Sequence, residues 1–146
     1  MNGEQLFNRL LKLWGTDGAP RCRILICSDK TIPTDSEGLY ICNIISKKHW
    51  IVVYKTADGT LEFFDPTGAV ELRLLDVLLK DRTMNGKAYA VNNVKLQGEN
   101  SNDCGYFCLL YTILRLKMQC SMFDSIYSLY DCRAYVKRIG LCKQHV

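Results

Sequence analysis

The segment from Cys104 to Met118 constrains the fold more than any other, because it is apolar on nearly every side of a helix. A helix of this kind has no polar stripe to turn toward water, so it has to be buried among other elements. We therefore predict a helix over these residues at the centre of the molecule. A polar, glycine-containing loop at residues 97–103 precedes it, so the helix is expected to begin at Cys104.

Cys104 therefore stands at the expected first position of the central helix. The unpaired backbone N–H groups and the partial positive charge of a helix N-terminus favour a thiolate, which is the nucleophilic form of cysteine. Gln97 precedes it in the loop and carries a neutral amide donor. Such a donor can hold the oxyanion that forms when a thiolate attacks a carbonyl carbon. Taken alone, Asp103 before a helix indicates only an ordinary N-cap.

A nucleophilic cysteine needs a base, and the chain has two histidines, His49 and His145. His145 is next to last, where chain ends usually fray. His49 begins a run of β-branched and aromatic residues at 49–54 that predicts a strand, and a second strand-like run at 61–65 ends with Asp65. The Asp-Gly sequence between the runs predicts a β-hairpin. Antiparallel pairing would put His49, at the start of one strand, beside Asp65, at the end of the other.

Each of these residues has a plainer interpretation when it is considered alone. A lone His49 is more simply a half-buried strand residue, and Asp65 before Pro66 is more simply a turn former. The set as a whole favours catalysis, because four suitable residue types occur in one chain order: His49, Asp65, Gln97 and Cys104.

The remaining pattern predicts an α+β fold. Three further helices are expected where apolar residues recur at helical spacing, over residues 6–14, 71–80 and 122–139. Three further strands are expected over residues 23–27, 39–45 and 87–94. We predict a mostly antiparallel central sheet packed with helices, with the nucleophile cysteine at the N-terminus of the central helix, in a single domain over residues 1–146.

Composition argues against several classes of protein. No apolar run reaches the roughly 18 residues of a membrane span, so we expect no membrane partner. Eight cysteines would suggest four disulfides in a secreted chain, but the N-terminus lacks the plan of a signal peptide and 48% of the residues are apolar. Most of the cysteines are therefore expected to be reduced and buried. No Cys-x-x-Cys pair occurs, so no metal is expected.

Three local sequences together resemble a known family. His-Trp at 49–50, Phe-Phe-Asp-Pro-Thr-Gly at 63–68 and Gln-Gly-Glu-Asn-Ser-Asn-Asp-Cys-Gly-Tyr-Phe-Cys at 97–108 are similar to the adenovirus-type cysteine proteases (adenain). They resemble more distantly the proteases that release SUMO-like modifiers. The resemblance runs roughly over residues 39–116, and residues 4–15 also look like the short leading helix of adenain.

The resemblance implies a role for each residue of the set. It implies that His49 is the general base, Asp65 the orienting acid, Gln97 the oxyanion donor and Cys104 the nucleophile. Trp50 is expected mainly to pack in the core. The resemblance implies that it also lines the substrate groove. No cofactor is implied, because a thiol, an imidazole and a carboxylate suffice for this chemistry.

Two positions depart from the adenoviral pattern. Asp65 stands where the adenoviral members have Glu, whereas the SUMO proteases also have Asp there. The exchange of Glu for Asp keeps the charge and shortens the side chain by one methylene. Gly86 stands where the adenoviral members carry a cysteine that bonds an activating peptide, so activation by that disulfide is not expected. DNA activates the adenoviral relatives, and a net charge of +4 is compatible with DNA as an activator here, although scattered basic residues equally indicate plain solubility.

The leading hypothesis is a viral or virus-like thiol endopeptidase that matures precursor proteins and cleaves after glycine-containing motifs. We expect viral precursor proteins and DNA as partners, a monomer, and a location in the virion and in the nucleus or cytoplasm of the host cell. Two alternatives stay open. One is a SUMO- or ubiquitin-like-modifier protease, and the other is a catalytically silent module that binds DNA or a virion protein.

Overall fold

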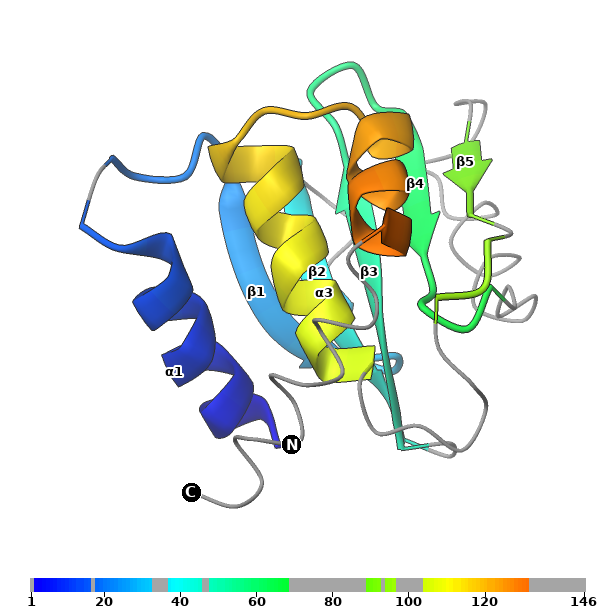
Figure 1. Cartoon of the computed structure of the whole chain (residues 1–146). Helices are drawn as coiled ribbons and strands as arrows, with labels where there is room; N and C mark the ends of the chain where they lie inside the picture. Colours follow the sequence, from blue (N-terminus) through cyan, green and yellow to red (C-terminus); the bar gives the residue numbers. More distant parts are fainter. Residues whose placement is uncertain are drawn as a thin grey trace.

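The computed structural model describes residues 2–16, 18–32, 37–45, 48–68, 89–92, 94–96 and 104–131. In chain order its elements are α1 (Gly3–Trp14), β1 (Arg23–Ser28), β2 (Gly38–Ile44), β3 (His49–Lys55), β4 (Leu61–Phe64), β5 (Tyr89–Val91), α3 (Cys104–Thr112) and η2 (Ile113–Lys117). Residues 122–131 are also helical. Figure 1 shows α3 lying across the middle of the sheet, with α1 to one side of it.

The five strands form one sheet in the order β1-β2-β3-β4-β5. The α+β class is confirmed, but the expected mostly antiparallel sheet is mixed. The pairs β2–β3 and β3–β4 are antiparallel, whereas β1–β2 and β4–β5 are parallel. The antiparallel pairs join strands that short stretches of chain separate, 45–48 and 56–60, whereas the parallel pairs join strands that longer stretches separate, 29–37 and 65–88.

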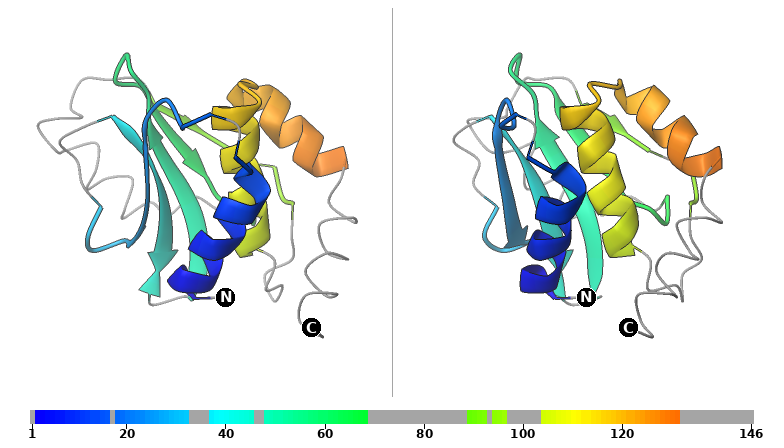
Figure 2. Two further views of the ribbon diagram at one scale, coloured as in Figure 1. Left: turned by 90° about the vertical axis from the view of Figure 1, so that its left-hand side faces the viewer. Right: turned by 60° about the vertical axis from the view of Figure 1, so that its left-hand side comes forward.

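The helices α1, α3 and 122–131 lie on the same face of the sheet, as the two views of Figure 2 show. The main core fills the space between them and the sheet, and eight of the nine residues of α3 are buried in it. The prediction that this helix is buried is therefore confirmed. A second apolar cluster occupies the opposite face of the strands and consists of Tyr40, Cys42, Ile44, Ile51, Val53, Leu61 and Phe63.

Helix α1 is set by clear signals at both of its ends. Asn2 accepts a hydrogen bond from the backbone N–H of Gln5, and the Gln5 side chain accepts one from the backbone N–H of Asn2, which completes a capping box. The helix ends at Gly15, whose φ of +78° suits glycine. Its predicted apolar stripe is only partly confirmed, because Leu11 is 54% exposed and turns toward solvent.

The central helix changes its geometry after Thr112, where the π-helical segment η2 begins. The backbone N–H of Met118 donates to the carbonyl of Ile113, five residues back, at 3.0 Å. The helix expected at 104–118 is therefore present from Cys104 to Lys117, one residue shorter than predicted and wider in its last part. The expected helix at 71–80 lies outside the described residues, as does the second half of the one expected at 122–139.

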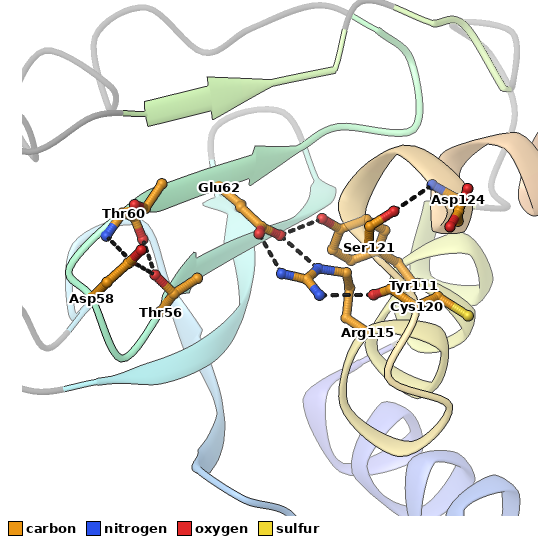
Figure 3. Close-up of polar contacts among 9 residues, drawn as sticks. All are labelled: Thr56, Asp58, Thr60, Glu62, Tyr111, Arg115, Cys120, Ser121 and Asp124. Carbon is orange, nitrogen blue, oxygen red and sulfur yellow. Dashed lines mark hydrogen bonds and ion pairs between the residues drawn. The ribbon is translucent and has the colours of Figure 1, made fainter.

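A buried ion pair ties this helix to strand β4. Glu62 accepts hydrogen bonds from the Tyr111 hydroxyl at 2.8 Å and from Arg115 Nε at 2.9 Å, and Arg115 Nη2 pairs with its second carboxylate oxygen. Arg115 Nη1 also donates to the carbonyl of Cys120 at 2.8 Å. Figure 3 shows these contacts converging on the Glu62 carboxylate. The network joins the sheet, α3 and the chain beyond η2, and so fixes where α3 lies along β4.

Candidate active site

The β3–β4 hairpin brings His49 and Asp65 into direct contact. Strand β3 begins at His49, and strand β4 ends at Phe64, which pairs with Val52 and is followed directly by Asp65. The His49 Nε2 atom lies 2.7 Å from Asp65 Oδ1. The two residues that the sequence predicted to be neighbours are thus joined by a hydrogen bond.

The carboxylate of Asp65 is held by the turn that follows it. Its Oδ1 atom accepts hydrogen bonds from the backbone N–H of Thr67 at 2.9 Å and from the Thr67 hydroxyl at 2.7 Å, besides its contact with His49. The backbone N–H of Gly68 donates to the Asp65 carbonyl at 2.9 Å and closes the turn. Asp65 thus combines the turn-forming role with an orienting contact to the imidazole, so the two interpretations of this residue are compatible.

Asn92, just beyond β5, also contacts Asp65 and was not predicted from the sequence. Its Oδ1 atom accepts from the backbone N–H of Asp65 at 2.6 Å, and its Nδ2 group donates to the Asp65 carbonyl at 2.6 Å. Asn92 is 3% exposed. The only sequence signal was a polar residue inside the strand expected at 87–94, of which the structure shows β5 (Tyr89–Val91).

The chain after Asn92 packs against the same turn. The backbone N–H of Leu96 donates to the carbonyl of Pro66 at 2.8 Å. At Gly68, where φ is +75°, an added Cβ would lie 3.1 Å from the backbone of Val94 and Lys95. Glycine is therefore needed there both for its backbone angle and for this close approach.

The surroundings of His49 raise its pKa from 6.5 to about 9. Burial by itself lowers this pKa, but hydrogen bonds to the side chains of Asp65 and Cys104, together with negative charge on both, outweigh the effect of burial. Since Nε2 bonds Asp65, Nδ1 is the ring nitrogen left for the Cys104 thiol. The imidazole is thus suited to remain protonated at neutral pH.

Cys104 is the first residue of α3 and is 5% exposed. Cys108 lies one turn further along the helix, and burial raises its pKa well above 9.0, with the nearby Cys104 as a further cause. Of the two thiols on this face, Cys104 is the one that bonds an imidazole. A thiol kept neutral by burial is a poor nucleophile, so Cys108 is suited to packing.

Two predicted residues need separate comment. Trp50 is 6% exposed and belongs to the main core, which agrees with its packing role, while its contact with substrate stays a prediction. Gln97 lies outside the described residues, as does Gly86, so the oxyanion donor and the missing peptide disulfide also stay predictions.

The six cysteines in the described part of the chain are free thiols. Cys27 and Cys42 lie in register on β1 and β2, with their sulfur atoms 3.4 Å apart. Over the described residues, no group of three or more His, Cys, Asp or Glu side chains could hold a metal ion. In the same part of the chain, none of the helices has the length and apolar character required to cross a membrane.

The sequence matches no model of a known protein family and no curated protein. The chemistry of the site is therefore inferred from its own geometry. An imidazole held by a carboxylate through one nitrogen, with a thiol at a helix N-terminus near the other, is an arrangement suited to nucleophilic attack by sulfur.

Proposed function

We propose that this chain is a thiol endopeptidase of the adenain-like kind, with Cys104 as nucleophile, His49 as general base and Asp65 as orienting acid. The observation that carries the proposal is the 2.7 Å contact between His49 Nε2 and Asp65 Oδ1, made by a histidine that also bonds the Cys104 thiol. The chain order His, Asp, Gln, Cys and the local sequences around these residues support the same reaction class.

The reaction starts from a thiolate–imidazolium pair, in which His49 holds the proton of Cys104. The thiolate attacks the carbonyl carbon of the scissile peptide, and the resulting oxyanion is stabilised by the Gln97 amide and the backbone N–H of Cys104. His49 returns its proton to the leaving amine as the C–N bond breaks, which leaves a thioester on Cys104. Water, deprotonated by His49, then hydrolyses the thioester and regenerates the thiol.

The proposed substrates are precursor proteins of a virus or virus-like element, cleaved after glycine-containing motifs. The resemblance supports glycine just before the scissile bond, since the groove of such enzymes is narrow. It also supports DNA as an activator and an action inside the virion or the infected cell. A modifier protease uses the same chemistry and differs in the folded protein that it recognises, so substrate panels separate the two.

Cleavage of a fluorogenic glycine-containing peptide in reducing buffer tests the proposal, with and without duplex DNA, at low and high salt. We expect turnover by the wild type and none by Cys104→Ser. Cys120→Ser is the matched control, since Cys120 is a partly exposed thiol with no part in the proposed mechanism. The Cys120→Ser variant should retain turnover. Gln97→Ala should lower turnover by about 10²–10³-fold.

Labelling with iodoacetamide separates an enzyme without its substrate from a silent binding module. If Cys104 reacts first but no peptide is cut, the substrate was wrong and the panel is extended to modifier fusions. If Cys104 reacts no faster than the other cysteines and no substrate is cut, the endopeptidase is refuted and a binding module is the better description. An effect of DNA should weaken steeply as salt is raised.

A further inference from the structure

Asn92 extends the pairing between β4 and β5 beyond the last paired residues of the two strands. The two strands are parallel, and Phe63 pairs with Val91. The backbone N–H of Asn92 then donates to the carbonyl of Phe63 at 3.2 Å. Its side chain bonds the backbone N–H and C=O of Asp65, both at 2.6 Å. The carboxamide thus supplies one donor and one acceptor to Asp65, as a neighbouring strand would.

Asp65 needs such a partner because of where it lies. It is 6% exposed, so its backbone N–H and C=O are largely removed from water and require hydrogen bonds. It also follows the last residue of β4 and precedes Pro66, which has no N–H to continue a ladder. The side chain of Asn92 satisfies the N–H and shares the C=O with Gly68.

The position of this peptide group decides where the Asp65 carboxylate lies. A charged hydrogen bond of 2.7 Å, like that to His49, weakens steeply when the partners separate by a further 1 Å or so. An apolar side chain in place of Asn92 could fill the same volume but could not hold the peptide. A carboxamide presents a donor on one atom and an acceptor on the atom beside it, so it can bond the N–H and the C=O of one residue at the same time.

We propose that Asn92 is a positioning residue of the catalytic site, which holds the Asp65 peptide so that the Asp65 carboxylate meets the imidazole of His49. The inference rests on the proposed function of the His49–Asp65 pair. Asn92 touches none of the reacting atoms and acts through Asp65.

The test is the titration of the His49 ring protons by NMR, in a His145→Gln background that leaves a single histidine. Among the described residues, the ionisable side chains that act on His49 are those of Asp65, just after β4, and Cys104, at the start of α3. In Asn92→Ala, the pKa of His49 should fall by about one unit or more, because the contact with Asp65 is loosened. In Asn92→Ser, where a hydroxyl can replace at most one of the two bonds, the fall should be smaller.

Tyr111→Phe is the matched control. It removes one buried hydrogen bond of 2.8 Å to β4, at Glu62, and leaves the ring in place. Both Tyr111→Phe and Asn92→Ala should lower the urea concentration at the midpoint of unfolding, because each leaves a buried polar group without its partner, but only the Asn92 variants should change the pKa of His49. Should Asn92→Ala not fold, Asn92→Ser gives the same comparison.

The outcomes distinguish this inference from the proposed function. An unchanged pKa of His49 in folded Asn92 variants overturns the inference, and so does an equal change in Tyr111→Phe. A pKa of His49 near 6.5 in the wild type overturns the inference as well, since there would then be no contact between His49 and Asp65 for Asn92 to maintain. The titration needs no substrate, so a wild type that cuts no peptide counts against the proposed function and not against the role of Asn92.

Discussion

Replacing Asp65 by asparagine should remove the charge that stabilises the His49 imidazolium while it preserves the shape of the site. In the wild type, burial lowers the pKa of His49, and the hydrogen bonds and charges of Asp65 and Cys104 raise it to about 9. Asp65→Asn keeps the burial and loses one of the two charges. The pKa of His49 should therefore fall toward, or below, its ordinary value of 6.5.

The size of the effect follows from the two pKa values. The rise from 6.5 to about 9 corresponds to roughly 3 kcal/mol of preference for the imidazolium. At a pH of about 8, an imidazole with a pKa of about 9 is roughly 90% protonated, whereas one with a pKa of 6.5 is roughly 3% protonated. The protonated fraction of the His49 imidazole at that pH should thus fall by up to ~30-fold.

NMR titration of His49 and the rate of iodoacetamide labelling at Cys104 measure this change. Asp58→Asn is the matched control, because it makes the same change of charge at the tip of the same hairpin. There the Asp58 carboxylate accepts hydrogen bonds from Thr56 and Thr60, which lower its pKa to about 2, with the Thr56 hydroxyl as the main cause. An unchanged pKa of His49 in Asp65→Asn, or the same change in Asp58→Asn, would refute the reasoning.

Three further outcomes are expected. Arg115→Met leaves the buried Glu62 carboxylate without its cation. The free energy of unfolding measured by urea titration should therefore fall by about 3–5 kcal/mol. A loss below about 1 kcal/mol is the size expected of an exposed ion pair and would contradict a buried one. Cys108, whose pKa burial raises well above 9.0, should be alkylated after Cys104 at neutral pH, and mass spectrometry that finds both labelled together would count against Cys104 as the nucleophile. The rate of peptide cleavage should decline as the pH rises through about 9, because His49 then loses the proton that the leaving amine needs. A rate that stays constant well above that pH would exclude the His49 imidazolium as the general acid.

The parts of the fold and site that were predicted correctly depend on signals close together in the chain. The hairpin that joins His49 to Asp65 is closed by the Asp-Gly turn, where Gly59 has a φ of +86°. The start of the central helix was given by the change from a polar loop to an apolar run at Cys104. Periodicity and turn chemistry report local structure, so they locate such elements well.

The parts that were missed depend on pairs far apart in the chain. Asn92 and Asp65 are 27 residues apart, and Glu62 and Arg115 are 53 residues apart. Each of these residues is polar and would suit a surface position by composition, and only the arrangement of β4, β5 and α3 brings them together. The parallel pairs of the sheet were missed for the same reason, since strand patterns do not reveal the direction of a neighbour.

The π-helical segment at Ile113–Lys117 gives this part of the chain an unusual tolerance to loss of length. A π-turn contains one residue more than an α-turn, so deletion of a single residue there would let the helix continue as an ordinary α-helix. The chain beyond such a deletion would keep roughly the same angle around the helix axis, whereas the same deletion in α3 would rotate it by about 100°. The bond between Arg115 and the carbonyl of Cys120, and the helix at 122–131 beyond it, should therefore survive a deletion in η2 better than one in α3.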